Sequence, residues 1–177
     1  MCLFVCSPTV VALDAPPPIV AAQGTLQAAF APWDDVEGLI VTALRGAQQD
    51  ILVQAYLLTN KPVVRALIAA RQRGVQVQVL VDAEQALDDK YSGITALVNA
   101  DIPVWLETQY QHAHNKLMII DAASAASVVI TGSFNFTWTA QHKNAENILI
   151  ARNNRPLATR YATNWERHRQ DATAYKK

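Results

Sequence analysis

The sequence predicts a single α/β domain whose β-sheet is mixed, largely parallel and sandwiched by helices. Residues 50–83 read as a strand, an amphipathic helix and a second strand, the pattern of two parallel strands joined by a right-handed crossover. Strand and helix patterns keep alternating further along the chain, as expected for a sheet with helices on both faces. Of the 177 residues, 51% are hydrophobic, so the chain can build a core, and its length suits one domain.

Each expected element rests on its own pattern. Residues 25–30, TLQAAF, suit a strand, and Pro32-Trp33-Asp34-Asp35 signals the start of a helix in which Leu39, Ile40, Ala43 and Leu44 recur at helical spacing. The central unit comprises a strand at 50–59, a helix at 62–74 that Gly74 closes, and a strand at 75–83. We then expect a helix at 93–100, strands at 102–106, 114–120 and 127–131, a helix beginning near Phe136, and a strand at 144–151.

Charge is balanced overall but is unevenly distributed. The formal net charge is zero, which argues against binding of nucleic acid through bulk positive charge. Residues 152–177, however, hold seven Lys and Arg against Glu166 and Asp171. This end of the chain is either a surface that faces a polyanion or an ordinary solvated helix face.

Residues 1–24 are expected to form a signal-like or flexible N-terminal segment. Residues 3–13, LFVCSPTVVAL, are apolar and precede DAPPP, like the apolar region and cleavage zone of a secretory signal, although the basic region is missing. The run is too short to span a membrane. It predicts a periplasmic or secreted protein, with a cytoplasmic one as the alternative. Cys2 and Cys6 both lie here, which excludes a disulfide framework or a Cys-based zinc site in the core.

The candidate chemistry lies at 112–146. In an extended strand His112, His114 and Lys116 share one face, at the polar end of an apolar run. A neighbouring imidazole and ammonium repel when both are charged, unless an anion lies between them. A phosphodiester suits this place, because lysine neutralises an oxygen while histidine attacks phosphorus or protonates the leaving oxygen. Lysine then stabilises the charge as Mg²⁺ often does, so we expect no metal and no other cofactor.

Further polar residues follow this strand. Gly132-Ser133-x-Asn135 lies between a strand and a helix, where we expect exposed backbone N–H groups and two side-chain donors for phosphate. Glu146, at the start of the next strand, could hold the Nδ1–H of the imidazole. Taken singly, each residue also fits an ordinary structural role: Asp121 begins a hairpin turn, and Asn135 is a good N-cap.

Together, His114-x-Lys116-x₄-Asp121 and Gly132-Ser133-x-Asn135 resemble the HKD motif of the phospholipase D superfamily. The chain is most similar to small bacterial, metal-independent endonucleases that carry a single motif and resist chelators. The strand-helix-strand start, the IP-x-W segment, GSFNFT and KNAEN-x-x-I follow that family's order over roughly residues 25–170. The resemblance implies a phospholipase D-like fold for 25–177. Ten residues separate Asp121 from Gly132, where the family usually has six, so AASAAS looks like a longer hairpin tip.

The resemblance also implies the role of each residue. His114 corresponds to the nucleophile, Lys116 to the phosphate clamp, Ser133 and Asn135 to auxiliary donors, Glu146 to the partner of the histidine, and Asp121 to a mainly structural or orienting residue. Family catalysis uses two facing motifs, so a homodimer with one shared site is expected. The implied function is non-specific endonuclease action on DNA, with RNA as a further substrate, through a phosphohistidine and without a membrane span.

Two further residues are weaker candidates for substrate binding. His112 could touch the substrate or be a plain edge residue, and Trp138 could stack a base or simply pack.

Three other functions stay open. A lipid phosphodiesterase or phosphatidyl transferase belongs to the same superfamily but usually carries two motifs in a longer chain. His112 and His114 could instead bind zinc together with His142, His168 or a carboxylate, although Lys116 would then place a cation beside the metal. Finally, the fold could serve as a non-catalytic nucleic-acid-binding module.

Overall fold

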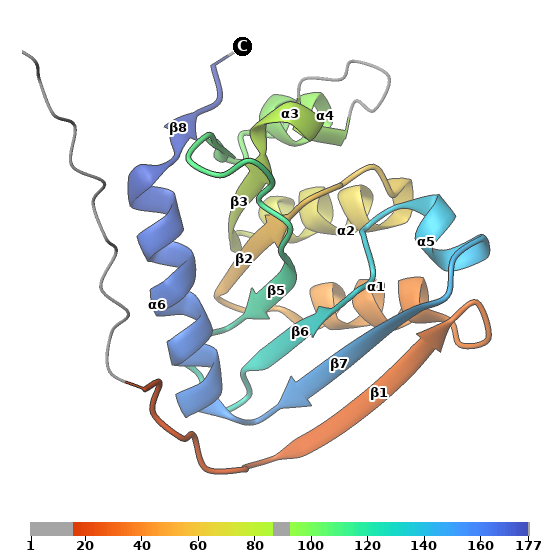
Figure 1. Ribbon diagram of the computed structural model, residues 1–177, viewed down its shortest axis with the longest axis vertical. Coiled ribbons are helices and arrows are strands. Elements are labelled where there is room, and N and C mark those ends of the chain that lie inside the picture. Colours follow the sequence, from red (N-terminus) through yellow and green to blue (C-terminus); the bar gives the residue numbers. More distant parts are fainter. Residues whose placement is uncertain (1–15, 87–92, 177) are drawn as a thin grey trace, which may run out of the picture.

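The structure is a computed structural model that describes residues 16–86 and 93–176. Its centre is an eight-stranded sheet in the order β1-β7-β6-β5-β2-β3-β4-β8 (Figure 1). The strands are β1 (Thr25–Ala31), β2 (Asp50–Ala55), β3 (Gln76–Asp82), β4 (Val104–Glu107), β5 (Lys116–Ile120), β6 (Val128–Gly132), β7 (Glu146–Arg152) and β8 (Thr173–Ala174). The helices are α1 (Val36–Gly46), α2 (Lys61–Gln72), α3 (Ala83–Ala86), α4 (Gly93–Asn99), α5 (Trp138–His142) and α6 (Arg155–Asp171). Most of the signal-like segment, with both cysteines, lies outside the described residues.

The sheet is mixed, as predicted, but the expectation that it is largely parallel was wrong. Only the β2–β3 and β3–β4 pairs are parallel. The other five pairings are antiparallel. Parallel neighbours need a long crossover, and α2 and α4 supply one after β2 and after β3. Between β4 and β7 the successive strands are joined by a loop, a hairpin and a connection that holds the short helix α5, and the chain reverses direction at each of them. The long helix α6 then joins β7 to β8.

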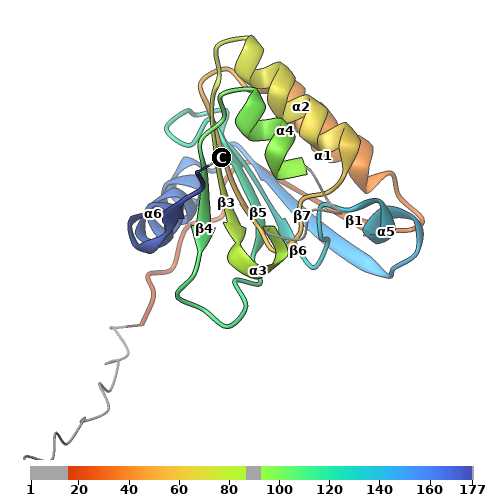
Figure 2. The ribbon, with the colours of Figure 1, turned by 90° about the horizontal axis from the view of Figure 1, so that it is seen from above.

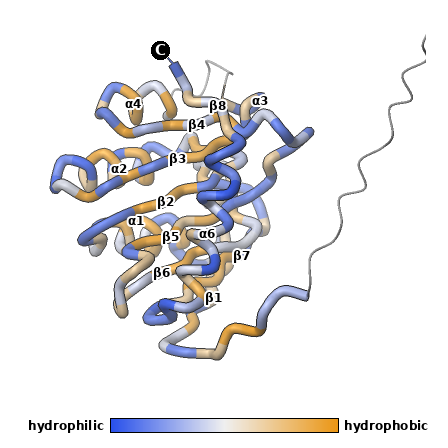
Figure 3. The backbone as a smooth tube through the Cα atoms, turned by 90° about the vertical axis from the view of Figure 1, so that its left-hand side faces the viewer, coloured by the Kyte–Doolittle hydropathy of each residue, from blue (hydrophilic) through white to orange (hydrophobic). Residues whose placement is uncertain are grey.

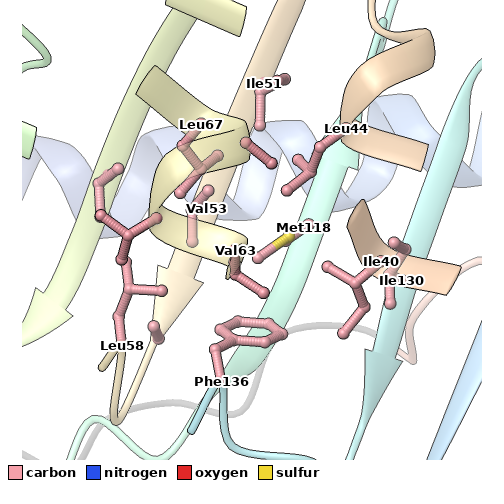
Figure 4. Close-up of a cluster of buried hydrophobic side chains, with 14 of the residues drawn as sticks. Ile40, Leu44, Ile51, Val53, Leu58, Val63, Leu67, Met118, Ile130 and Phe136 are labelled. Atoms are coloured by element: carbon pink, nitrogen blue, oxygen red, sulfur yellow. The ribbon is translucent and has the colours of Figure 1, made fainter. Parts of the chain in front are cut away.

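Helices cover both faces of the sheet, as predicted. Helices α1, α2 and α4 lie on one side, and α6 crosses the other side (Figures 1 and 2). The larger core lies under α1 and α2, where Ile40, Leu44 and Leu67 meet Val53 and Met118 (Figure 4). A smaller core lies under α6, around Trp165. Figure 3 shows how the apolar residues concentrate in the strands of the sheet.

Strand β5 lies in the middle of the sheet between β6 and β2. All five of its residues are buried. Met118 and Ile120 join the core under α1 and α2, whereas Leu117 and Ile119 join the core under α6. The predicted interior strand is confirmed, but it begins at Lys116 rather than at His114. His112 and His114 therefore lie in the loop that leads into the strand.

Other predicted boundaries shift for local reasons. Helix α1 starts after the N-cap Asp35, whose side chain accepts the N–H of Gly38, and it ends at Gly46. Helix α2 starts after Asn60, which accepts the N–H of Val63, and it ends just before Gly74, whose φ of 93° suits glycine. Strand β2 ends at Ala55, because the chain then turns toward α2.

The C-terminal region forms one long helix. Asn154 caps α6 by accepting the N–H of Leu157, and Trp165 anchors the helix by donating its Nε1–H to the carbonyl of Val53 at 2.9 Å. The short elements α3 and β8 were not expected. No helix in the described ranges is both long and apolar enough to cross a membrane.

Candidate active site

The candidate site lies at the edge of the sheet where β2, β3 and β4 end and β5 begins. Ala55 pairs with Lys116, and the N–H of Tyr56 donates to the carbonyl of Asn115 at 2.8 Å. On the other side, the N–H of Ala113 donates to the buried carboxylate of Asp82 at 2.8 Å. The segment that carries His112 and His114 is thus held by both β2 and β3.

His114 presents an exposed imidazole at this edge. Its ring lies 4.5 Å from the ring of Tyr56, centroid to centroid, with a tilt of 56°. His112 is also exposed and meets the same tyrosine edge-on at 6.3 Å. The two histidines therefore share one aromatic neighbour.

Lys116 is buried, with 7% of its surface exposed. Its Nζ donates to the carbonyl of His114 at 2.9 Å and lies 5.0 Å from the ring centroid of Tyr56. Burial lowers the pKa of Lys116, and the charge of Glu146 partly opposes this by favouring the ammonium. An ammonium held at the end of a strand, largely removed from water, is a strong partner for an incoming anion.

Ser133 and Glu146 lie together at the adjoining ends of β6 and β7. The Ser133 hydroxyl donates to Oε2 of Glu146 at 2.5 Å, and Asn144 donates to Oε1 at 2.9 Å. No hydrogen bond joins Glu146 to the His114 imidazole within the part of the chain that the structure describes. The electrostatic link of Glu146 to the site runs instead to Lys116.

The backbone N–H groups of the first two residues after Gly132 are paired within the chain and are not exposed for phosphate. The N–H groups of Ser133 and Phe134 both donate to the carbonyl of Asn147, at 3.1 and 3.4 Å, because pairing continues beyond the end of β6. Asn135 is half-buried, and its Oδ1 has no hydrogen-bond partner among the described residues. Helix α5 starts only at Trp138, with Thr137 as its N-cap.

Asp121 lies at the other end of β5, away from the other motif residues. Its carboxylate accepts the N–H groups of Gln48, Gln49 and Asp50 at 2.7–3.1 Å. The five residues of β5 separate it from His114 by about 16 Å or more. Asp121 therefore has structural contacts, one of the two roles that the resemblance implied.

The longer hairpin tip follows Asp121. The N–H of Ser124 donates to the carbonyl of Asp121 at 2.8 Å, and that of Ser127 to the carbonyl of Ser124 at 3.3 Å. The β5–β6 ladder is regular from the Ile120–Val128 pair to the Leu117–Thr131 pair. The extra residues are thus accommodated in the turn, at the end of the hairpin remote from His114.

Trp138 is 56% exposed on α5. The His142 ring lies 4.6 Å from it, and Lys143 Nζ lies 5.9 Å from its centroid. The Trp138 side chain does not pack in the core. Its stacking on a base stays a prediction.

The residues of the zinc alternative are dispersed. His168 bonds through Nδ1 to the buried carboxylate of Glu107 at 2.6 Å, and His142 lies against Trp138. In residues 16–86 and 93–176, no three His, Cys, Asp or Glu side chains form a group that could hold a metal ion.

Sequence reasoning missed Tyr56 and Asp82. The strand that the sequence predicts at 50–59 includes Tyr56, and the one that it predicts at 75–83 has Asp82 near its end. Both become recognisable once β2 is known to pair with β5, because that pairing brings the ends of β2 and β3 to the histidine loop. The available signal was an aromatic or acidic residue near the end of a predicted parallel strand.

The chain matches known proteins in both sequence and fold. Residues 40–169 match the family model described as "Cardiolipin synthase, PLD-like domain". A Rickettsia prowazekii protein named Phospholipase D is 38% identical over 144 residues, which are 81% of this chain and 67% of that protein. A Xenopus laevis protein named Mitochondrial cardiolipin hydrolase is 30% identical over 117 residues, 66% of this chain and 53% of the relative.

A solved structure covers nearly the same residues. The crystal structure of Nuc from Salmonella typhimurium, described as a phospholipase D family member, superposes with a TM-score of 0.79 at 29% identity. The match covers 86% of this chain and 99% of Nuc. By contrast, the chain spans about two thirds or less of the curated relatives named above.

Proposed function

The chain belongs to the phospholipase D superfamily of phosphodiesterases, and from this premise we propose that it is a non-specific endonuclease. In this proposal catalysis needs no metal, and two copies of the chain share one active site. DNA is the proposed substrate, with RNA as a further one. One observation carries the proposal: the exposed His114 imidazole and the buried Lys116 ammonium lie against the same Tyr56 ring where β5 begins. The carboxylate of Glu146, which accepts the Ser133 hydroxyl, acts on the charge of that ammonium.

The proposed reaction has two displacements at phosphorus. A neutral His114 nitrogen attacks the phosphodiester, the bond from phosphorus to the leaving oxygen breaks, and His114 of the second copy gives that oxygen a proton. The second histidine then removes a proton from water, which attacks phosphorus and breaks the bond to the first histidine. Lys116 offsets the negative charge that develops on the nonbridging oxygens.

An uncovered face of the sheet supports the second copy. Leu26, Phe30 and Leu149 are 66, 50 and 40% exposed. Ala29 and Ala31 of β1 belong to the core under α1 and α2, so Leu26, Ala28 and Phe30 face the other side of the sheet, together with Leu149, which pairs with Ala28. On that side no helix of the described chain lies in front of β1 (Figure 1). These four residues, here called the open face, are all uncharged, so the surface can meet its own copy without charge repulsion.

The open face leads directly to the candidate site. Phe30 pairs with Asn147, whose side chain donates to the Ser133 hydroxyl at 3.3 Å. A second copy that binds the open face would therefore lie next to Ser133. This continuity supports a composite site at the interface.

The form of the site favours a polymeric substrate. His112, His114 and Ser133 are all exposed, so a long chain can reach them. Arg155, Arg160 and Arg167 are exposed on α6 and offer cations to a polyanion. A phospholipase or phosphatidyl transferase is the second candidate, because the named relatives include a Phospholipase D and a Mitochondrial cardiolipin hydrolase. As part of the proposal, the N-terminal segment directs the protein to the periplasm or out of the cell.

The test is plasmid digestion in EDTA by the wild type and by His114→Ala, run beside hydrolysis of phosphatidylcholine and cardiolipin vesicles. We expect the wild type to nick supercoiled DNA with EDTA present and His114→Ala to lose at least about 1,000-fold in rate. Faster turnover of lipid than of DNA would support the second candidate. If His114→Ala nicks DNA as fast as the wild type, His114 has no catalytic role. If EDTA abolishes the activity of the wild type, the metal-free mechanism is wrong.

Oligomeric mass tests the shared site. We expect a dimer by sedimentation, and we expect Phe30→Asp to weaken both dimer and activity. Gln27→Asp is the matched control, because Gln27 lies on the opposite face of the same strand. A wild-type monomer with full activity would contradict the shared site.

A further inference from the structure

We infer that Tyr56 is a positioning residue that holds His114 and Lys116 in the orientation that attack on phosphorus needs. This inference rests on the proposed phosphodiesterase function. It assigns a role to a side chain just past β2, outside the HKD motif.

Tyr56 lies beside three basic side chains at this end of the sheet, those of His112, His114 and Lys116. Its ring lies 4.5 Å from that of His114 and 6.3 Å from that of His112, and the Nζ of Lys116 lies 5.0 Å from its centroid. Its backbone is fixed as well, since its N–H donates to the carbonyl of Asn115, the residue between His114 and Lys116. The tyrosine is thus anchored to the segment that its ring contacts.

The contact matters because His114 has little else to hold it. Its imidazole makes no hydrogen bond to another described side chain, and its surface is exposed. An exposed, unbonded imidazole samples several rotamers, and only some of them aim a ring nitrogen at phosphorus. The ring of Tyr56 removes rotamers that would swing the imidazole away.

The ring also suits the charges in the reaction. A histidine that takes a proton becomes a cation beside the Lys116 ammonium, and the two charges repel. The face of an aromatic ring is electron-rich and attracts both cations at such distances. The ring, rather than the phenol hydroxyl, performs this task, so phenylalanine should replace tyrosine.

The experiment compares Tyr56→Leu with Tyr56→Phe in the full-length protein. Tyr161→Leu is the matched control, because Tyr161 is a half-buried tyrosine on α6 beside the smaller core. Rates are measured on a fluorescent DNA duplex, with kcat and KM separated. We expect Tyr56→Leu to lower kcat about 100-fold, the cost of slight misplacement of a reacting group, with a small change in KM. Tyr56→Phe and Tyr161→Leu should stay within about twofold of the wild type.

Proton NMR supplies a readout that a merely structural role would not move. The ring protons of His114, assigned with His114→Ala, should be shifted by the ring current of Tyr56 in the wild type and in Tyr56→Phe. In Tyr56→Leu they should move toward the positions of a free imidazole. Cross-relaxation between the two rings in the wild type tests the contact without any variant.

The outcomes separate this inference from the proposed function. If His114→Ala is inactive but Tyr56→Leu keeps a wild-type kcat, the positioning role is wrong and the nuclease proposal stands. If His114→Ala stays active, the proposed function itself fails. If Tyr56→Leu does not fold, the wild-type spectrum is decisive, because absence of cross-relaxation between the two rings overturns the inference and its presence supports it.

Discussion

The His114-x-Lys116-x₄-Asp121 motif spans strand β5, and the residues at its two ends have opposite surroundings. At the Lys116 end, an exposed imidazole has no side-chain hydrogen bond in the described chain, and a buried ammonium keeps free hydrogens for an anion. At the Asp121 end, one carboxylate accepts three backbone N–H groups from residues 48–50. One end has spare bonding capacity and the other is saturated.

This difference separates two reasons for which a motif residue can be needed. Groups with unused donors bind something that arrives later, whereas a saturated carboxylate holds its own chain together. Substitutions at the Lys116 end should therefore change rate with little loss of stability. Substitutions at the Asp121 end should change stability with little loss of rate.

The largest expected effect is that of Lys116→Met, which removes the ammonium and keeps an unbranched chain. We expect kcat/KM on DNA to fall about 1,000-fold, because the charge that develops on the phosphate oxygens loses its partner. The melting temperature should stay constant or rise, since a buried amine no longer has to be desolvated. A variant with a wild-type rate would show that Lys116 serves the fold.

Asp121→Ala should have the next largest effect, and on stability. Three backbone donors lose their acceptor, so we expect the free energy of unfolding to fall by about 2–4 kcal/mol in a denaturant titration. Asp121→Asn is the matched control, because it keeps one acceptor oxygen and tolerates the positive φ of 51° at this position. The free energy of unfolding should fall less in Asp121→Asn than in Asp121→Ala.

The rate separates the structural role of Asp121 from a catalytic one. Measured below the melting transition, kcat of Asp121→Ala should stay within about threefold of the wild type, since the reacting groups lie about 16 Å away. A stable Asp121→Ala protein without activity would contradict the purely structural role of the Asp121 end of β5.

Glu146→Gln should shift the pH dependence of activity. The carboxylate raises the pKa of Lys116 against the stronger, lowering effect of burial. Without that charge the pKa falls further, so Lys116 loses its proton sooner and the alkaline limb of kcat/KM moves to lower pH. Glu166→Gln on α6 is the control, and its alkaline limb should coincide with that of the wild type. Coincident profiles for Glu146→Gln would show that Lys116 does not govern this limb.

The smallest effect is expected for Asp50→Asn, beside Asp121. Burial raises the pKa of Asp50, the N–H of Ala122 lowers it, and the Asp121 charge raises it, with a net increase from the ordinary 3.8. The folded chain therefore holds this proton more tightly, and stability falls as pH rises through the interval above 3.8. Asparagine keeps the acceptor for Ala122 and removes the charge.

At pH 7 we expect Asp50→Asn to gain about 0.5 kcal/mol or less, because solvent screens this half-buried group. The gain should disappear in melts below pH 3.8, where the wild-type carboxyl is protonated as well. A loss of stability at pH 7 would show that the Asp50 charge is needed at this end of β5.

Much of the fold could be predicted because its signals are local. The β2–α2–β3 unit follows from the periodicity of residues 50–83, and the burial of Met118 and Ile119 follows from a run that is apolar at every position. The hairpin turn after Asp121 indicates that β5 and β6 are antiparallel, but the direction of the other strands after β4 could not be predicted, because it depends on which strands become neighbours. Local periodicity contains no information about neighbours.

The sequence by itself determined that His114, Lys116, Ser133 and Glu146 are the residues to examine, because spacing and residue type are properties of the chain. Tertiary structure alone decided that Asp121 stands apart from them and that Tyr56 joins them. The antiparallel pairing of β2 with β5 brings Tyr56 beside the histidines. The length of β5 places Asp121 at the opposite end of that strand. Distance along a chain and distance in space coincide only within one element, and this site is assembled from the ends of several.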